Sequence, residues 1–214
     1  MLNRHNLNIV KLAAKQESQH QLTGLRVEPG RTSVTDGVRL MTVTTPGFPI
    51  ADYPDLSGTL GVKPTKQFEP FTMDAETALK IAKAIPKRSS IPILGVAVVG
   101  EASNANGSAQ IAVTDLENPQ VFSTAKLDGQ YPDIDRVIPA KGTKPLVKIG
   151  LDARMLAGML QQVVSFHDDV RKGQEVYCEL SIYGPEVAMR LDCHNNWQEM
   201  VGVLMPCRPP KTGE

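Results

Sequence analysis

The chain has 214 residues, 41% of them hydrophobic and 21% charged, which is the composition of a globular protein able to bury a core in one or two domains. Its 23 basic and 23 acidic residues give a formal net charge of zero, so any attraction to nucleic acid has to come from a local patch. The odd number of cysteines, Cys178, Cys193 and Cys207, without Cys-x-x-Cys spacing, indicates reduced thiols and no zinc site.

Targeting and membrane signals are not found. The first ten residues, MLNRHNLNIV, lack the uninterrupted hydrophobic stretch of a signal peptide. The longest hydrophobic run, IPILGVAVV (91–99), is far too short to span a bilayer. We therefore expect a cytoplasmic protein that does not bind a membrane.

The first structural unit begins at the N-terminus. LNIVKLAAK (7–15) has the pattern of a helix, and TSVTDGVRL (32–40) that of a strand closing on Asp36. Between them, Pro29 and Gly30 predict a hairpin turn.

Two further segments repeat this pattern. Each passes from a short extended stretch through an aspartate, which we interpret as a helix N-cap, into a helix: FTMDAETALKIAKAI (71–85, Asp74) and KIGLDARMLAGMLQQVV (148–164, Asp152). Their hydrophobic residues fall on one helix face. These residues are Ala78, Ile81, Ala82 and Ile85 in the first helix, and Met155, Leu156, Met159, Leu160 and Val163 in the second.

Hairpin strands follow both helices. We predict turns at Asn106-Gly107 and at Gly184-Pro185, with later strands closing on Asp115 and Asp192 in the place of Asp36. The Pro- and Gly-rich stretches 46–70 and 139–145 indicate connectors. The chain is thus predicted to be α+β, with three βαβββ units that place helices on one face of a continuous sheet.

One segment, LDGQYPDIDRVIP (127–139), fits neither a core strand nor an amphipathic helix. Its two prolines remove backbone donors and fix φ, so it is predicted to be an extended connector of defined shape. Tyr131, Val137 and Ile138 can anchor it, while Arg136 points elsewhere.

Three stretches together resemble landmarks of the bacterial sliding clamp, the β subunit of DNA polymerase III. They are TDGVRL (35–40), TAKLDGQYPDIDRVIP (124–139) and VGVLMPCR (201–208), in the order in which the family has them. The resemblance implies a DNA-clamp fold, with a two-unit domain at 1–140, a third half unit at 141–208 and a C-terminal tail at 209–214.

The sequence also departs from the family pattern. Family members resemble three tandem domains of two units each, whereas we count three units here, and nothing resembles the first domain. The histidine usual in the first landmark is replaced by Val38. Whether the chain closes a ring is therefore left open.

The resemblance implies a shallow hydrophobic pocket for short peptide motifs of polymerases and repair proteins. Rigid prolines, an adaptable methionine and arginine donors suit such a groove, although each residue taken alone also fits a core or turn position. The implied residues are Leu22, Thr35, Gly37, Arg39, Leu40, Pro132, Arg136, Val137, Val203 and Met205.

Basic residues on the helices are candidates for sequence-independent contacts with the phosphates of double-stranded DNA. On the first helix Asn8, Lys11 and Lys15 are spaced to share a face. An ordinary solvated face explains any single helix equally well. The candidates are Lys11, Lys15, Lys80, Lys83, Lys87, Arg88 and Arg154.

We expect no catalysis and no cofactor, because the sequence has no phosphate-binding loop, nucleophile elbow or paired histidines, and His167-Asp168-Asp169 is better explained as a helix-end loop. Two functions remain. One is a processivity clamp that encircles or contacts DNA, involves a clamp loader and assembles as a homo-oligomer. The other is a clamp-derived adaptor that binds peptide motifs without encircling DNA.

Overall fold

The computed structural model describes residues 1–16, 22–45, 62, 64–65, 67–87, 91–100, 108–125, 127, 129–140, 142–167, 175–195 and 198–207. They belong to two compact units, Met1–Pro139 and Ala140–Glu214. Within these described ranges, no helix is long and hydrophobic enough to cross a membrane. All three cysteines are free.

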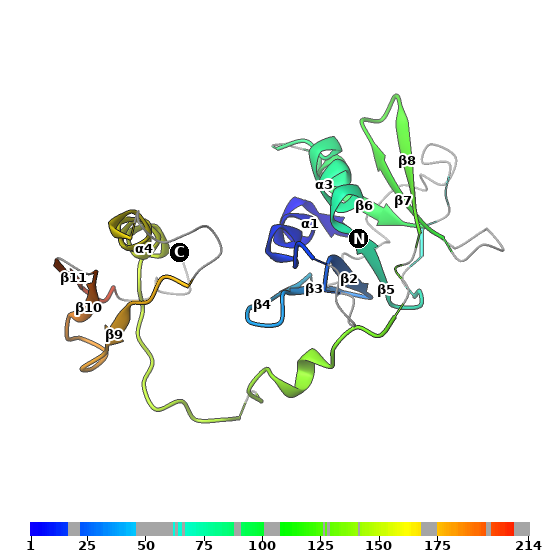
Figure 1. Cartoon of the computed structure of the whole chain (residues 1–214). Helices are drawn as coiled ribbons and strands as arrows, with labels where there is room; N and C mark the ends of the chain where they lie inside the picture. The colour runs from blue at the N-terminus through cyan, green and yellow to red at the C-terminus, as the bar shows by residue number, and fades with distance from the viewer. Residues whose placement is uncertain are drawn as a thin grey trace. The chain divides into compact units, whose positions relative to one another are not determined.

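The first unit contains two halves with one pattern, a short strand followed by a helix and three antiparallel strands (Figure 1). The first half consists of β1 (Leu2–Asn3), α1 (Arg4–Asn8), the 3-10 helix η1 (Ile9–Leu12), β2 (Gly24–Glu28), β3 (Arg31–Thr35) and β4 (Leu40–Thr44). The second half consists of β5 (Phe71–Asp74), α3 (Ala75–Ala84), the 3-10 helix η3 (Pro92–Gly95), β6 (Val96–Val99), β7 (Ala109–Thr114) and β8 (Pro119–Thr124), and η4 (Ile134–Arg136) follows.

The two halves exchange their first strands. β1 of the first half pairs with β6 of the second, and β5 of the second half pairs with β2 of the first, both antiparallel. The resulting sheets have the strand orders β1-β6-β7-β8 and β4-β3-β2-β5. Each sheet is therefore complete only because the other half supplies a strand.

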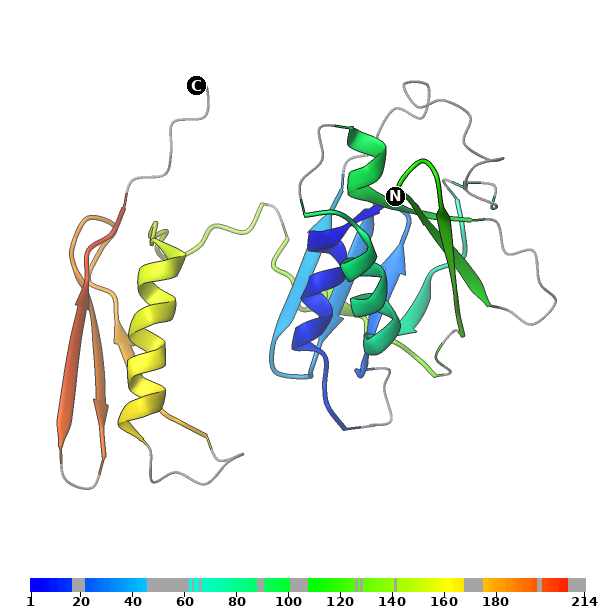
Figure 2. The same ribbon diagram turned by 90° about the horizontal axis from the view of Figure 1, so that it is seen from above.

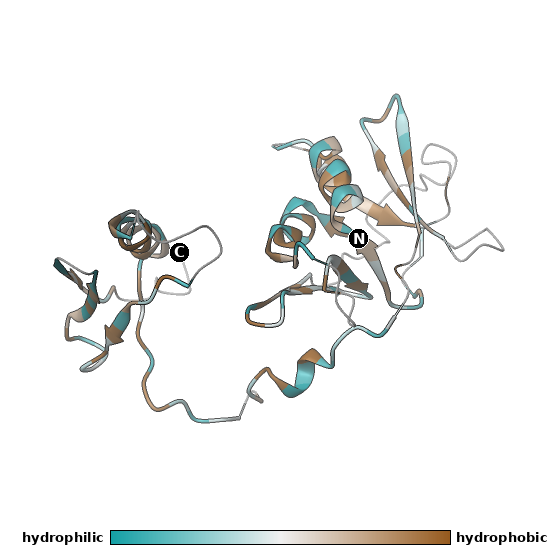
Figure 3. Ribbon diagram, viewed as in Figure 1, coloured by the Kyte–Doolittle hydropathy of each residue, from teal (hydrophilic) through white to brown (hydrophobic). Residues whose placement is uncertain are grey.

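Both halves share one core. α1 and α3 lie side by side (Figures 1 and 2), and a single cluster of buried residues joins them to both sheets. The side chains of Leu7, Leu25, Met73 and Ile81 are fully buried in it. β6, with the sequence VAVV, is hydrophobic (Figure 3) and buried along its whole length: Ala97 and Val99 belong to the shared core, and Val98 packs with Val62 and Ala112.

The second unit repeats only one half. It contains α4 (Ala153–Phe166) and the antiparallel strands β9 (Glu179–Ser181), β10 (Met189–His194) and β11 (Glu199–Leu204), in the order β11-β10-β9. Its buried cluster is small, with Val163, Leu191 and Cys193 at the centre.

The structure confirms the predicted fold class and its repeated helix-plus-hairpin pattern. The hairpin turn at Pro29-Gly30 is confirmed, with Gly30 at φ +78°, and Asp74 and Asp152 are confirmed as N-caps that accept from first-turn amides. The predicted turn at Asn106-Gly107 and most of the connector 46–70 lie outside the described residues.

Three details of the prediction were wrong. The first helical segment begins and ends three residues earlier than predicted: α1 starts at Arg4 and continues as the 3-10 helix η1, which ends at Leu12, so Lys15 is not on it. Asp192 lies inside β10, opposite Val201, and the residue that occupies the turn after β10 is Asn195. Among the described residues, the third copy has no strand before its helix, and no other strand of this unit pairs with the stretch 149–152.

The helix faces are confirmed only in part. Ala78, Ile81, Ala82 and Ile85 of α3 are all buried, as predicted. On α4 only Val163 is buried, while Met155 and Leu160 are exposed. α4 is amphipathic as predicted, but the three-stranded sheet of the second unit covers less of its hydrophobic face.

Candidate peptide-binding and DNA-binding sites

The turn between β3 and β4 is fixed by Asp36. Its Oδ1 accepts hydrogen bonds from the N–H groups of Arg39 at 2.7 Å and Val38 at 3.0 Å, and its Oδ2 accepts from the Arg39 guanidinium at 2.7 and 2.9 Å. The Arg39 amide, then its guanidinium and the Val38 amide lower the pKa of Asp36 to about 2. Gly37 has φ +93°, a conformation that glycine adopts without strain.

The predicted pocket residues of the first hairpin gather around this turn. Thr35 is buried, and its hydroxyl accepts a hydrogen bond from the N–H of Gly37 at 3.1 Å. Leu22 is half-buried, and its Cδ1 lies 3.7 Å from where a Cβ on Gly37 would be. Leu40 is also half-buried. The Arg39 side chain is largely exposed, although Asp36 already takes two of its donors.

The proline-braced segment that leaves the first unit is attached to the hairpin of β2 and β3. Ile134 is buried, and the Arg31 guanidinium donates to both carboxylate oxygens of Asp135, at 2.6 and 3.1 Å. Arg31 also donates to Glu28 at 2.7 Å. The pKa of Asp135 is lowered by the Arg31 hydrogen bond, and that of Arg31 is raised by Asp135 and then Glu28.

Tyr131 is a second anchor of this segment. Its ring lies 5.7 Å from the Arg26 guanidinium, within the range of a cation–π contact. Burial raises the pKa of Tyr131 to about 12, partly offset by the nearby Arg26 charge. Its buried hydroxyl has no hydrogen-bond partner among the described residues.

These anchors leave two predicted pocket residues pointing into solvent. Val137 is 72% exposed, and Arg136 is exposed with an ion pair of 2.8 Å to Asp133. Pro132 is half-buried. Because Tyr131 and Ile134 supply the buried contacts, Val137 is free of any structural role in the core, which contradicts its predicted role as an anchor.

The anchors and the turn occupy different ends of β3. The exit segment is held near Arg31, at the start of the strand, and the turn follows Thr35, at its end. Four residue steps along a strand cover about 13 Å. The two predicted groups of pocket residues in this unit therefore lie toward opposite ends of β3 rather than at a single point.

Val203 and Met205 belong to the second unit. Val203 lies on β11 and Met205 directly follows the strand, and both side chains are exposed. Val203 and Val201 are on the face of the sheet away from α4, because the alternate residue Gly202 is the one that approaches Met159 of that helix.

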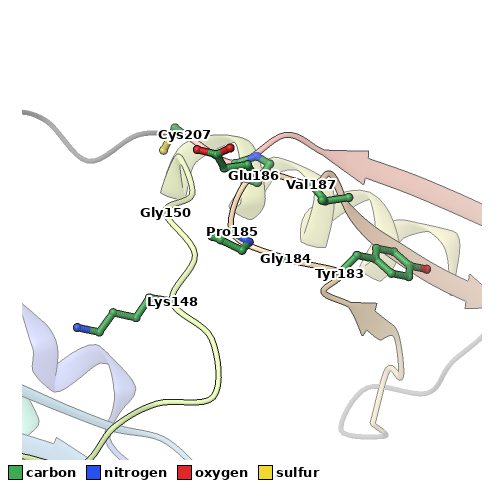
Figure 4. A pocket seen from close by; sticks show the side chains of 9 residues that line it. Lys148, Gly150, Tyr183, Gly184, Pro185, Glu186, Val187 and Cys207 are labelled. Carbon is green, nitrogen blue, oxygen red and sulfur yellow. The ribbon is translucent and has the colours of Figure 1, made fainter.

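A groove that was not predicted from the sequence lies beside the residues that follow β11 (Figure 4). It has a volume of about 820 Å³ and runs between the stretch 148–150, the loop 183–187 and Pro206-Cys207. Its charged side chains are Lys148 and Glu186, and Lys148 points away from the loop (Figure 4). No signal in the sequence marks it, because two glycines, two prolines and backbone atoms form much of its wall.

The predicted DNA-binding residues are all on the surface where they are described. Lys80 and Lys83 are exposed on α3, Lys87 follows that helix, and Lys11 is exposed on η1. Lys80 forms an ion pair of 2.7 Å with Glu76, and the hydrogen bond that it donates to this carboxylate raises the pKa of Lys80.

The other candidates are more scattered. Lys15 is exposed beyond the end of η1, and Arg154 is exposed in the first turn of α4, 3.7 Å from Asp152. Arg88 lies outside the described residues. Of the described candidates, Lys80 and Lys83 lie on α3, and Lys11 lies on η1, which directly follows the adjacent helix α1.

The region around His167 has a structural role. Its Nδ1 is 2.9 Å from the carbonyl oxygen of Val163 and its Nε2 is 3.1 Å from that of His194, so the ring joins the end of α4 to the end of β10. Asp168 and Asp169 lie outside the described residues. In the part of the chain that is described, no group of three or more His, Cys, Asp and Glu residues could hold a metal ion.

Comparison with known proteins supports the fold. No protein-family model and no curated protein matches the chain at a significant level. Solved structures of bacterial sliding clamps do match it. The DnaN sliding clamp of Pseudomonas aeruginosa bound to griselimycin matches with a TM-score of 0.62 and 16% identity over 96% of this chain and 49% of that one.

Two further clamps match similarly. The DNA polymerase sliding clamp of Bacillus subtilis has a TM-score of 0.59 and 16% identity over 96% of this chain and 48% of that one. That of Caulobacter crescentus has a TM-score of 0.60 and 14% identity over 96% and 49%. This chain therefore spans about half the length of the clamps it matches, and it has the sliding-clamp fold.

Proposed function

We propose that the protein is a sliding-clamp-like factor of DNA replication that contacts duplex DNA and binds polymerase and repair proteins through short peptide motifs. The observation that carries this proposal is the exit segment at 130–139. Its buried contacts are made by Tyr131 and Ile134, and it still presents Val137 and Arg136 to solvent. A segment with only a linking function needs no such anchoring.

Two surfaces are proposed to contact peptides: this segment with the turn after β3 in the first unit, and the end of β11 in the second. A linear motif with one or two large hydrophobic side chains would contact Leu40 and Val137 on the first surface, or Val203 and Met205 on the second. Arg136 and Arg39 have guanidinium donors left to bind its backbone or a carboxylate. The exposed thioether of Met205 can adapt to side chains of different shape.

A peptide titration tests this site. We expect a fluorescent peptide with a polymerase-type clamp-binding motif to bind with micromolar affinity, and Met205→Ala to weaken binding by roughly 1 to 2 kcal/mol, because a few buried anchors dominate small interfaces. Val201→Ala is the matched control, since Val201 is an exposed valine on the same strand outside the proposed site. Equal anisotropy curves for the parent and the folded Met205→Ala variant would rule out the site.

The DNA contact is proposed to use α3 together with η1, which continues the adjacent helix α1, and the residues just after η1. Replacing Lys11, Lys15, Lys80 and Lys83 by alanine should flatten the log–log salt dependence of duplex binding by up to about one unit per lysine, with no change in sequence preference. The control replaces Lys144 and Lys148, which are exposed but outside these helices. If the quadruple variant keeps the parent's slope, these helices do not bind DNA.

A clamp-derived adaptor that binds peptides without encircling DNA is the second candidate. The zero net charge favours it, as does the ion pair that links Lys80 to Glu76. Retention on nicked circular DNA, with release after the circle is cut, is expected of an encircling clamp. An adaptor should show equal retention on circular and linear DNA.

A further inference from the structure

The second unit has the elements of half a domain. In the first unit, each set of three hairpin strands receives a fourth strand from the other half: β5 joins β2, and β1 joins β6. The corresponding set in the second unit, β9 to β11, has three strands, and β9 is the edge at which a fourth strand would pair.

The residues at the turns show which positions of the three halves correspond to one another. Asp36, Asp115 and Asn195 each follow the middle strand of a hairpin set and cap the next turn through a side-chain oxygen. Four residues before them, Thr32, Ile111 and Leu191 pair with Val27, Val99 and Leu180, respectively. Leu180 of β9 is therefore the counterpart of Val27 of β2 and Val99 of β6.

The second unit also contains a stretch in the place of a first strand. Asp152 caps α4 as Asp74 caps α3, which makes the stretch 149–152 the counterpart of β5. On one side, the two stretches accept equivalent backbone hydrogen bonds. The carbonyl oxygen of Thr72 accepts from the N–H of Leu127, and that of Gly150 accepts from the N–H of Cys207, both at 2.9 Å. On its other side β5 pairs with β2, whereas among the described residues of the second unit 149–152 has no partner strand.

Hydrophobic side chains are exposed where the first unit buries them. Leu180 is 44% exposed, while its counterparts Val27 and Val99 are 0% and 2% exposed. Leu160 is 36% exposed, while Ala82 at the same place on α3 is 2% exposed. Met155 and Val164 of α4 are exposed as well, and among the described residues of the second unit no second helix packs against α4 as α1 packs against α3.

We propose that this surface binds the same surface of a second copy of the chain, so that two second units form one complete clamp-type domain. Stretch 149–152 of each copy pairs antiparallel with β9 of the other. The register of β5 on β2 carries over as Asp152 opposite Tyr177, Leu151 opposite Cys178, Gly150 opposite Glu179 and Ile149 opposite Leu180.

A second copy fits because the required contacts are reciprocal. The two halves of the first unit exchange strands in both directions, and two identical halves can do the same about a two-fold axis. Each copy can supply what the other lacks: among the described residues of the second unit, the stretch 149–152 has no partner strand, and β9 is unpaired on one edge. The inward positions of the strand also match: Ile149 and Leu151 occupy the places of Phe71 and Met73, and no like charges face each other in this register.

Sedimentation velocity of the whole chain tests the proposal. The parent should form a dimer in a concentration-dependent manner, and Leu180→Asp and Leu160→Lys should each weaken it by roughly tenfold or more. Val201→Asp is the control, because Val201 is 54% exposed on the opposite face of the sheet and should leave the dimer intact. Far-ultraviolet circular dichroism checks that each variant is folded.

An intermolecular disulfide tests the register separately. In a background with Cys193→Ala and Cys207→Ser, the substitution Leu151→Cys places a thiol opposite the native Cys178 of the other copy, at a Cα separation suited to a disulfide. Mild oxidation should give a covalent dimer on a non-reducing gel, and Leu146→Cys, outside the paired stretch, should not. Three results would each overturn the proposal. The parent could stay monomeric at about a hundred micromolar, or the dimer could be unaffected by Leu180→Asp and Leu160→Lys. The third is equal cross-linking of the Leu151→Cys and Leu146→Cys variants.

Discussion

At the scale of single residues, the turn at Asp36 shows how one carboxylate organises a loop. It accepts from two backbone amides and one guanidinium, and Asn195 holds the equivalent turn of the third copy with only an amide oxygen. Its charge is therefore needed for the Arg39 ion pair rather than for the turn itself. The two roles can be separated by substitution.

We predict that Asp36→Ala lowers the thermal midpoint of the first unit by a few degrees, because two amides lose their acceptor, and that Asp36→Asn lowers it less. The pKa of Asp36 is lowered to about 2, below its unfolded value of 3.8. Its contribution to stability is therefore complete above about pH 4 and is lost as the pH falls toward 2. Thermal melts across this range should show a shallower acid limb for Asp36→Asn, and identical limbs would contradict the assignment.

We predict opposite effects on stability for alanine substitutions at two glycines. A Cβ on Gly24 would lie 2.5 Å from the carbonyl oxygen of Met73 on β5, which cannot move without breaking the β2–β5 pairing. Gly24→Ala should therefore destabilise the first unit by about 1 to 3 kcal/mol. Gly158, in the middle of α4, has open space around its Cα, so Gly158→Ala should stabilise the second unit by about 0.5 to 1 kcal/mol. Urea unfolding of both variants measures the effects, and a neutral Gly24→Ala would show that β5 can shift away from β2.

At the scale of elements, local chemistry predicted the helices and hairpins well. Asp74 and Asp152 were identified as caps from the sequence because an N-cap needs only a short acceptor before a hydrophobic helix pattern. The exchange of first strands between the halves could not be predicted. Leu2 pairs with Ala97 and Met73 with Leu25 across long stretches of chain, and no local pattern encodes such distant partners.

The errors in the sequence analysis have the same origin. Asp192 has the residue type expected at the turn, but its side chain bonds to Arg190 within β10, while the turn falls three residues later at Asn195. The pattern on α4 predicted burial of Met155 and Leu160, yet burial depends on a partner half that the sequence cannot show. Of the candidate pocket residues, the sequence identified the exit segment, but its anchors Arg31 and Asp135 are 104 residues apart and came to light only in the structure.

At the scale of the whole molecule, the chain covers about half of each clamp it matches, and it contains one complete clamp-type domain and half of another. Two copies joined through their second units would contain three complete domains. Such an assembly would have about the length of one of the matched clamps. The central claim for the whole molecule is the proposed binding of polymerase-type peptide motifs.

Nuclear magnetic resonance of the methyl-labelled chain during titration with a clamp-binding peptide tests this central claim most directly. The account predicts that the methyl signals of Leu40 and Val137, or of Val203 and Met205, shift with a micromolar dissociation constant, while buried Val27 and Ile81 shift little. No shift of any of these four signals at millimolar peptide, or equal shifts of the buried residues, would contradict it.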